Sequence, residues 1–295
     1  MVGAFVATAL GLYSAPGTLH AFEGSEVGAL VGEGDEWWAI VDGHEVWRST
    51  GPGWERVARV PELRLNCLCP LEGAVLAGTS EAHLVEVSDE GPRLLSSFDE
   101  IAGRDDWFTP WGGPPDVRSM APSQEALFVN VHVGGILRSN DAAASWSQTI
   151  DINSDVHEVV AGPDALVVAA TAKGLAVSRD SAGSWSFEDD GLHASYCRAV
   201  ARCDDSVLMS ASVGPHGGRA AVYRWRLEDT TGFEKCESGL PEWFGDNIDS
   251  ACLDALAPTA AFGTSDGRVF VSEDAGLSWE LVASGLPPVR AVAIA

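Results

Sequence analysis

The chain has 295 residues, of which 46% are hydrophobic, so it is long and apolar enough for one all-β domain or for two ordinary domains. Its 43 acidic and 18 basic residues give a net charge of −25, which argues against nucleic acid or an acidic membrane surface as a partner. No stretch approaches the length of a membrane-spanning helix.

The start of the chain is predicted to belong to the fold and not to a secretory signal. Met1–Leu10 lacks a basic region, and Gly3–Ser14 aligns with the internal strand pair Asp164–Ser178. The cysteines fall mostly in predicted inner strands, which favours buried thiols over disulfides. Together these features predict a cytoplasmic protein in a reducing compartment.

Pairs of short apolar strands recur seven times along the chain. The second strand of each unit is predicted at Ala4–Ala9, Trp37–Val41, Ala74–Gly78, Ala126–Val131, Leu166–Ala170, Val207–Ala211 and Ala260–Gly263. The third is predicted at Gly11–Ser14, Val46–Ser49, Leu84–Val87, Ile136–Ser139, Leu175–Ser178, Ala221–Trp225 and Val269–Ser272. A unit of this size cannot bury its own apolar face, so the copies must stack on one another.

The two ends of the chain are predicted to complete one sheet. The chain begins on a second-strand pattern at Ala4–Ala9, and Val289–Ile294 resembles an innermost strand with no successor. We expect these two strands to pair, which leaves no sheet edge open. The prediction is a single all-β domain over residues 1–295, a seven-bladed β-propeller closed by its C-terminal strand. Six blades is the alternative.

Three units carry a turn with serine, aspartate and tryptophan at fixed spacing, at Ser139–Trp146, Ser178–Trp185 and Ser272–Trp279. This pattern resembles the Asp-box, or BNR, repeat of sialidases and of WD40/YVTN-like propellers, which runs Ser-x-Asp-x-Gly-x-Ser/Thr-Trp. The resemblance implies that the aspartate closes the turn and that the tryptophan packs between sheets. Its glycine is present only as Gly276. Ala143 and Ala182 replace it elsewhere, so we expect altered turns there, with Gly183 supplying backbone freedom in one of them.

Three long segments interrupt the repeat, and propeller topology predicts that they share one face. They are Asp99–Asp116, Ser212–Arg219 and Pro241–Asn247. Long loops with aromatic residues on a rigid scaffold are usual places for binding. We predict a site there for a small polar or anionic molecule, or for a protein partner. The alternative is that the aromatic side chains only plug the channel mouth. The predicted ligand-binding residues are Trp107, Trp111, Arg118, Glu158, Tyr196, Arg198, His216 and Asp249.

Several histidines fall at strand starts or turns on the same predicted face. Neutral imidazole suits Zn²⁺, Cu²⁺ and Fe²⁺. We therefore predict a divalent transition metal held by His132, His157 and His193. Asp155 or Glu158 is expected to add a carboxylate or to orient a ring. The competing interpretation is that each histidine is bonded within its own loop.

The functional prediction is a ligand-binding or enzymatic propeller, with metal dependence as one form of it. The resemblance to sialidases implies a second form, a glycoside hydrolase in which Arg118, Arg198 and Arg290 imitate the arginine triad beside Tyr196 and Glu158. The N-terminal Arg-Ile-Pro motif of sialidases is missing from this chain. Two alternatives remain, a protein-interaction scaffold similar to photosystem assembly factors and a purely structural domain. An enclosed pocket with titratable groups would favour an enzyme, and a broad rim would favour a scaffold.

Overall fold

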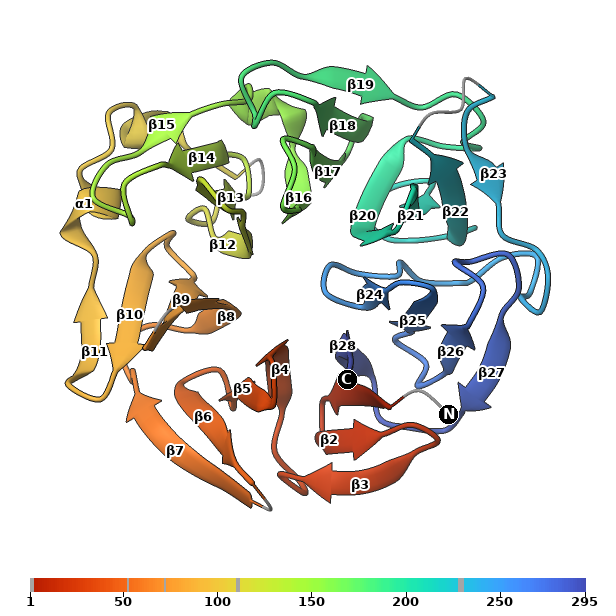
Figure 1. Cartoon of the computed structure of the whole chain (residues 1–295), viewed down its shortest axis with the longest axis horizontal. Helices are drawn as coiled ribbons and strands as arrows, with labels where there is room; N and C mark the ends of the chain where they lie inside the picture. The colour runs from red at the N-terminus through yellow and green to blue at the C-terminus, as the bar shows by residue number, and fades with distance from the viewer. Residues whose placement is uncertain (1–2, 52, 72, 110–111, 228–230) are drawn as a thin grey trace. The chain divides into compact units, whose positions relative to one another are not determined.

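The computed structural model describes residues 3–51, 53–71, 73–109, 112–227 and 231–295 (Figure 1). Its strands form seven four-stranded antiparallel sheets, so the chain is a seven-bladed β-propeller, as predicted. Among the described residues, no helix is both long enough and apolar enough to cross a membrane.

Each blade is one sheet, and six of the seven are continuous in sequence. Blade one contains β1 (Ala4–Thr8), β2 (Gly11–Ser14), β3 (Thr18–Ala21) and β28 (Val289–Ile294). Blade two contains β4 (Val27–Glu33), β5 (Glu36–Val41), β6 (Glu45–Thr50) and β7 (Gly53–Arg59). Blade three contains β8 (Leu65–Leu71), β9 (Ala74–Thr79), β10 (Leu84–Ser88) and β11 (Gly91–Leu94). Blades four and five contain β12 (Val117–Pro122), β13 (Leu127–Val131), β14 (Gly135–Ser139), β15 (Ser147–Gln148); and β16 (Val156–Ala161), β17 (Val167–Thr171), β18 (Gly174–Ser178), β19 (Ser186–Glu188). Blades six and seven contain β20 (Tyr196–Cys203), β21 (Ser206–Ser212), β22 (Ala221–Arg226), β23 (Glu234–Lys235); and β24 (Leu253–Leu256), β25 (Thr259–Gly263), β26 (Val269–Ser272), β27 (Glu280–Ala283). The short helices are α1 (Ser96–Asp99), η1 (Arg104–Asp106) and η2 (Ile152–Ser154).

The first blade joins the two ends of the chain. Strand β28 lies in the same sheet as the first strands of the chain (Figure 1). It pairs antiparallel with β1, with Ala4 opposite Ile294 and Val6 opposite Val292. The predicted closure is therefore confirmed. The carboxylate of Asp254 in β24 accepts a hydrogen bond from the Ile294 backbone N–H at 2.8 Å, and burial raises the pKa of this carboxyl. This contact attaches the closing strand to the next blade as well as to its own.

The chain folds into two compact units. The terminal unit comprises Met1–Val27, Ala170–Ala176 and Phe187–Ala295, and the middle unit comprises Gly28–Ala169 and Val177–Ser186. The core of the terminal unit gathers apolar side chains from blades six, seven and one, among them Leu208 and Phe262. The middle unit contains two apolar clusters. All six cysteines are buried thiols outside any disulfide.

The three Ser-Asp-Trp turns share one hydrogen-bond pattern. In each copy the first serine hydroxyl donates to the aspartate at 2.8 Å. The same carboxylate accepts from the backbone N–H and the hydroxyl of the second serine, four residues further on. Each turn is therefore held by its own aspartate, which is Asp141, Asp180 or Asp274.

The missing glycine does not alter two of these turns. Ala143 and Ala182 both adopt a φ of 66°, in the same left-handed region as Gly276 at 86°. The prediction that Gly183 supplies the backbone freedom is wrong, because the left-handed residue is Ala182 itself. In the third copy, a Cβ added to Gly276 would lie 2.6 Å from Cδ2 of the buried Leu208, so a larger residue there would require the Leu208 side chain to shift.

These turns predict how the protein responds to acid. Hydrogen bonds, first of all from Ser145 and Ser184, hold the pKa of Asp141 and of Asp180 at about 2, whereas an unfolded aspartate titrates near about pH 4. A carboxylate whose pKa falls on folding stabilises the protein above its unfolded pKa, and this stabilisation is lost as the pH drops through its folded pKa.

We therefore expect the thermal midpoint, followed by circular dichroism, to fall between about pH 4 and pH 2. The double variant Asp141→Asn/Asp180→Asn should be less stable at pH 7 and should show a smaller fall in this window. An equal fall in both proteins would show that these carboxylates do not contribute.

Candidate functional site

The structure divides the predicted site residues between the two units. The middle unit contains His132, His157, Arg118, Glu158 and Trp107, and the terminal unit contains His193, Tyr196, Arg198, His216 and Asp249. Trp111 lies outside the described residues.

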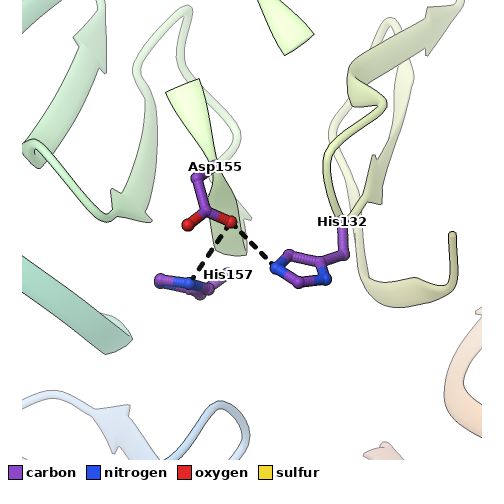
Figure 2. Close-up of side chains that lie close together, drawn as sticks. All are labelled: His132, Asp155 and His157. Atoms are coloured by element: carbon purple, nitrogen blue, oxygen red, sulfur yellow. Dashed lines mark ion pairs between the residues drawn. The ribbon is translucent and has the colours of Figure 1, made fainter. Parts of the chain in front are cut away.

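Two of the three predicted metal ligands meet in the middle unit around one carboxylate. His132 Nε2 lies 2.8 Å from Asp155 Oδ1, and His157 Nε2 lies 3.6 Å from the same oxygen (Figure 2). The three residues can each offer one ligand atom, with all three atoms within 4.8 Å of one another. The two rings are buried, at 1% and 0% exposure, whereas the Asp155 side chain is 33% exposed. The Asp155 oxygen that faces the two rings, Oδ1, is itself buried, so solvent reaches only the rest of this side chain.

Different elements bring these side chains together. His132 begins the turn between β13 and β14, and its backbone N–H donates to the Asp116 carbonyl at 2.9 Å. His157 is the second residue of the innermost strand β16, whose rigid pairing fixes its ring. Asp155 ends the 3₁₀ helix η2 in the left-handed region, at φ 51° and ψ 66°. Aspartate tolerates this conformation better than most residues, and strained backbone is common where a side chain must be aimed.

A second carboxylate lies behind His132. Asp116 Oδ1 is 3.5 Å from His132 Nδ1, on the opposite side of the ring from Asp155. Arg118 Nε donates to Asp116 at 3.1 Å and so holds this carboxylate in place. A histidine whose far nitrogen faces a carboxylate is the usual arrangement in metal sites, because the carboxylate fixes the orientation of the ring. Asp116 was not among the predicted site residues. Its position immediately before β12 could have suggested it.

Both carboxyl groups are held in the ionised form. Burial opposes ionisation of Asp116, but the bond with His132 and the charge of Arg118 outweigh it and hold the pKa below its usual value. Burial likewise opposes ionisation of Asp155, and the contacts with His132 and His157 again leave its pKa lowered. At neutral pH the site therefore presents an anionic oxygen between two imidazoles, which is a donor set that divalent transition metals accept.

The third predicted ligand, His193, does not belong to this group. It lies in the terminal unit, where Nδ1 is 2.7 Å from the Tyr223 hydroxyl and the ring contacts Trp243 at 4.6 Å between centroids. The third member of the group is Asp155, which lies beside His132 and His157. The reason is physical: loop membership predicts which end of a blade a residue occupies, but it does not predict which way its side chain points.

Three predicted ligand-binding residues meet in the terminal unit. Arg198 Nη1 donates to Asp249 at 2.8 Å, Nη2 donates to the Tyr196 hydroxyl at 3.4 Å, and the guanidinium lies over the Tyr196 ring. His216 is exposed in the connection between β21 and β22. Glu158 is buried on β16.

Aromatic side chains from two of the three insertions lie in the core. The sequence predicts Trp107 in an exposed binding loop, but its side chain is only 6% exposed and packs with Phe98 beneath Arg104. In the third insertion, Phe244 is buried edge-on against Phe262 and Phe270. These contacts place Trp107 and Phe244 in the apolar core, while Phe108 remains exposed.

Each of the three arginines predicted to resemble the sialidase triad is paired with an acidic side chain. Arg118 is bonded to Asp116, Arg198 to Asp249, and Arg290 lies 3.4 Å from Glu26. A guanidinium paired in this way already has a counter-charge in the protein, which a substrate carboxylate would have to share or displace. The arrangement of these arginines therefore gives the hydrolase interpretation no support.

No family model and no curated protein matches the chain. Solved structures do match. The WD40 propeller domain of Doa1 is 14% identical over 97% of this chain and 88% of that one, with a TM-score of 0.66. A structure titled YCF48 bound to D1 peptide is 13% identical over 94% and 84%, with a TM-score of 0.61. The GH74 xyloglucanase from Xanthomonas campestris is 13% identical over 94% of this chain and 46% of that one, with a TM-score of 0.60. At these identities the similarity shows the propeller fold alone, which supports both interaction proteins and enzymes.

Proposed function

We propose that this protein is a metal-dependent ligand-binding propeller, in which His132, Asp155 and His157 hold one divalent transition metal ion. The observation that carries the proposal is the placement of three ligand atoms of these residues within 4.8 Å of one another. Two imidazole nitrogens and a carboxylate oxygen are borderline and hard donors that suit Zn²⁺, Fe²⁺, Co²⁺ and Mn²⁺.

The distances support a shared ion. Ligand atoms about 2.0–2.2 Å from one metal lie about 3–3.5 Å from each other at tetrahedral or octahedral angles. The two nitrogen–oxygen separations, 2.8 and 3.6 Å, bracket that range. The two imidazole nitrogens lie within 4.8 Å of each other, so the side chains would adjust to bring all three atoms onto one ion.

The presence of only three protein ligands supports a metal ion that binds a further molecule, and not one with a purely structural role. Structural zinc sites are closed by four protein ligands, whereas three ligands leave a position for water or for a further ligand. Because Asp155 Oδ1 is buried, such a ligand would approach past the partly exposed remainder of the Asp155 side chain. The occupant proposed for this position is a small polar or anionic molecule.

Metal titration of the apo protein tests the proposal. Co²⁺ should bind with a stoichiometry of one and produce visible d–d absorption, and Zn²⁺ should displace it. His132→Ala, Asp155→Ala and His157→Ala should each abolish the absorption. Asp116→Asn should weaken Co²⁺ binding by about 10- to 100-fold, because it removes only the group that orients His132.

His83→Ala is the matched control. His83 also lies in the middle unit and also contacts a carboxylate, with Nδ1 2.7 Å from Asp99 Oδ1, but it is not part of the three-residue group. This variant should bind Co²⁺ like the unmodified protein. If His132→Ala and His83→Ala bind Co²⁺ equally, the group is an internal ion-pair network and the proposal fails.

The nature of the repeat is a separate inference. We infer that the repeat is of the Asp-box type, and the shared hydrogen bonds of the three turns support this. Such turns have a structural role, so this inference adds nothing to the proposed metal site.

A further inference from the structure

Three basic side chains surround one indole ring in the terminal unit. The Lys235 ammonium lies over the Trp243 ring, 3.9 Å from its centroid, and the Arg219 guanidinium lies over it at 4.5 Å. The imidazole of His193 contacts the same ring at 4.6 Å between centroids. Arg219 is exposed, and the other three residues are half-buried, so the cluster is open to solvent.

Separate segments of the chain build this cluster. Arg219 ends the connection between β21 and β22, and Trp243 follows β23. Their neighbours Ala220 and Phe244 form a two-way backbone bridge, with N–H to carbonyl distances of 3.0 and 2.8 Å. This bridge fixes the two side chains next to each other. Lys235 lies on β23, next to β22 (Figure 1), and the pairing of these strands places it opposite Tyr223.

The position of His193 is also fixed. Its ring is stacked on Tyr223 with 11° between the planes, and Nδ1 lies 2.7 Å from the Tyr223 hydroxyl. Burial, and then the positive charges of Arg219 and Lys235, lower the pKa of His193. The imidazole is therefore an uncharged member of the cluster, and the positive charge of the cluster comes from Arg219 and Lys235.

The two cations lack acidic partners in the described part of the chain. Neither Arg219 nor Lys235 forms an ion pair with a described residue, although the whole chain carries a net charge of −25. The acid bonded to Trp243 is Glu242, which accepts the indole N–H at 3.2 Å and so lies at the edge of the ring, while the cations lie over it. The indole offsets part of the repulsion between the two cations through its negative face, but it supplies no counter-charge.

We propose that Arg219 and Lys235 form a second binding site, in which their N–H groups hold the phosphate group of a small molecule at the solvent-exposed side of the cluster. An arginine fork and a lysine ammonium together suit a doubly charged oxyanion, because the fork gives paired hydrogen bonds and the ammonium gives a point charge. A singly charged carboxylate would satisfy one of the two cations and leave the other without a partner. This site shares no residue with the metal group, so each proposal can fail without the other.

Titration with inorganic phosphate tests the site directly. The ¹H–¹⁵N signal of the Trp243 indole, assigned by comparison with Trp243→Phe, should shift in a saturable manner with one phosphate bound. Arg219→Gln and Lys235→Gln should each weaken phosphate binding by about tenfold, since each removes charge-assisted hydrogen bonds. Arg219 is exposed, so this variant is expected to fold, and its thermal midpoint checks that it does.

Lys173→Gln is the matched control, because it removes the same charge from an exposed position of the same unit and should leave phosphate binding unchanged. Acetate at equal ionic strength should shift the indole signal much less than phosphate does. Equal phosphate affinity in Arg219→Gln and Lys173→Gln would overturn the site. An acetate shift as large as that of phosphate would overturn the assignment to a phosphate group.

Discussion

Deletion of Val289–Ala295 should leave a protein that does not reach the native fold. The deletion removes the strand that pairs with β1 and buries Val289, Val292 and Ile294. Burying each such side chain contributes about 1.5–3 kcal/mol, and a whole domain is typically stable by only about 5–15 kcal/mol. The deletion also exposes the backbone edge of β1, which favours aggregation. Loss of the cooperative thermal transition, followed by circular dichroism, would be the expected result.

A synthetic peptide with the sequence of Val289–Ala295 provides the control. Added to the truncated protein during refolding, it should pair with β1 and restore a cooperative transition, because strand addition at an open edge uses the same backbone hydrogen bonds. A peptide with the same residues in scrambled order should not. A truncated protein that melts at the same temperature as the full chain would show that β28 is dispensable.

Trp279→Ala should lower the free energy of unfolding by about 3–5 kcal/mol, the usual cost of removing a large buried aromatic side chain. The Trp279 side chain is 5% exposed and packs edge-on against Phe262 at 4.9 Å between centroids. Its indole N–H also donates to the Gly276 carbonyl at 3.1 Å, so the ring attaches its own turn to the core. Urea denaturation gives the free energy directly.

The equivalent tryptophan of another turn serves as the comparison for this variant. Trp185 ends the Ser178–Trp185 copy and is only half-buried, so Trp185→Ala should cost clearly less than Trp279→Ala. The two substitutions remove the same atoms from equivalent positions, and the difference between them reflects the deeper burial of Trp279 together with its indole hydrogen bond. Equal costs would mean that packing of the ring does not determine the contribution of the turn.

Periodicity made most of this fold predictable. An apolar strand every few tens of residues leaves stacking as the only way to bury apolar surface, and this requirement determines the architecture. The strand predicted at Val207–Ala211 is observed at Ser206–Ser212, and that predicted at Ile136–Ser139 is observed at Gly135–Ser139. The pairing of Val289–Ile294 with β1 followed from the same rule that no sheet edge is left open.

The candidate site was predictable only in part. A turn residue and the start of an inner strand lie at a known end of a blade, and so His132 and His157 could be expected near each other. The direction of a side chain depends on local dihedral angles, which spacing does not contain. For this reason the left-handed conformation of Asp155 and the stacking of His193 on Tyr223 could not be anticipated. Composition alone likewise did not show that Trp107 would turn into the core.

Because all six thiols are buried, their reactivity reports how often the protein opens locally. Burial raises the pKa of Cys67 and of Cys197, and it raises that of Cys236 to about 11, so these sulfurs stay protonated and unreactive while the fold is closed. An alkylating reagent can therefore react only during excursions that expose a strand. Cys67 and Cys69 lie in the middle unit and the other four in the terminal unit. The rate at which each thiol is modified thus records how often its own part of the molecule comes apart under native conditions.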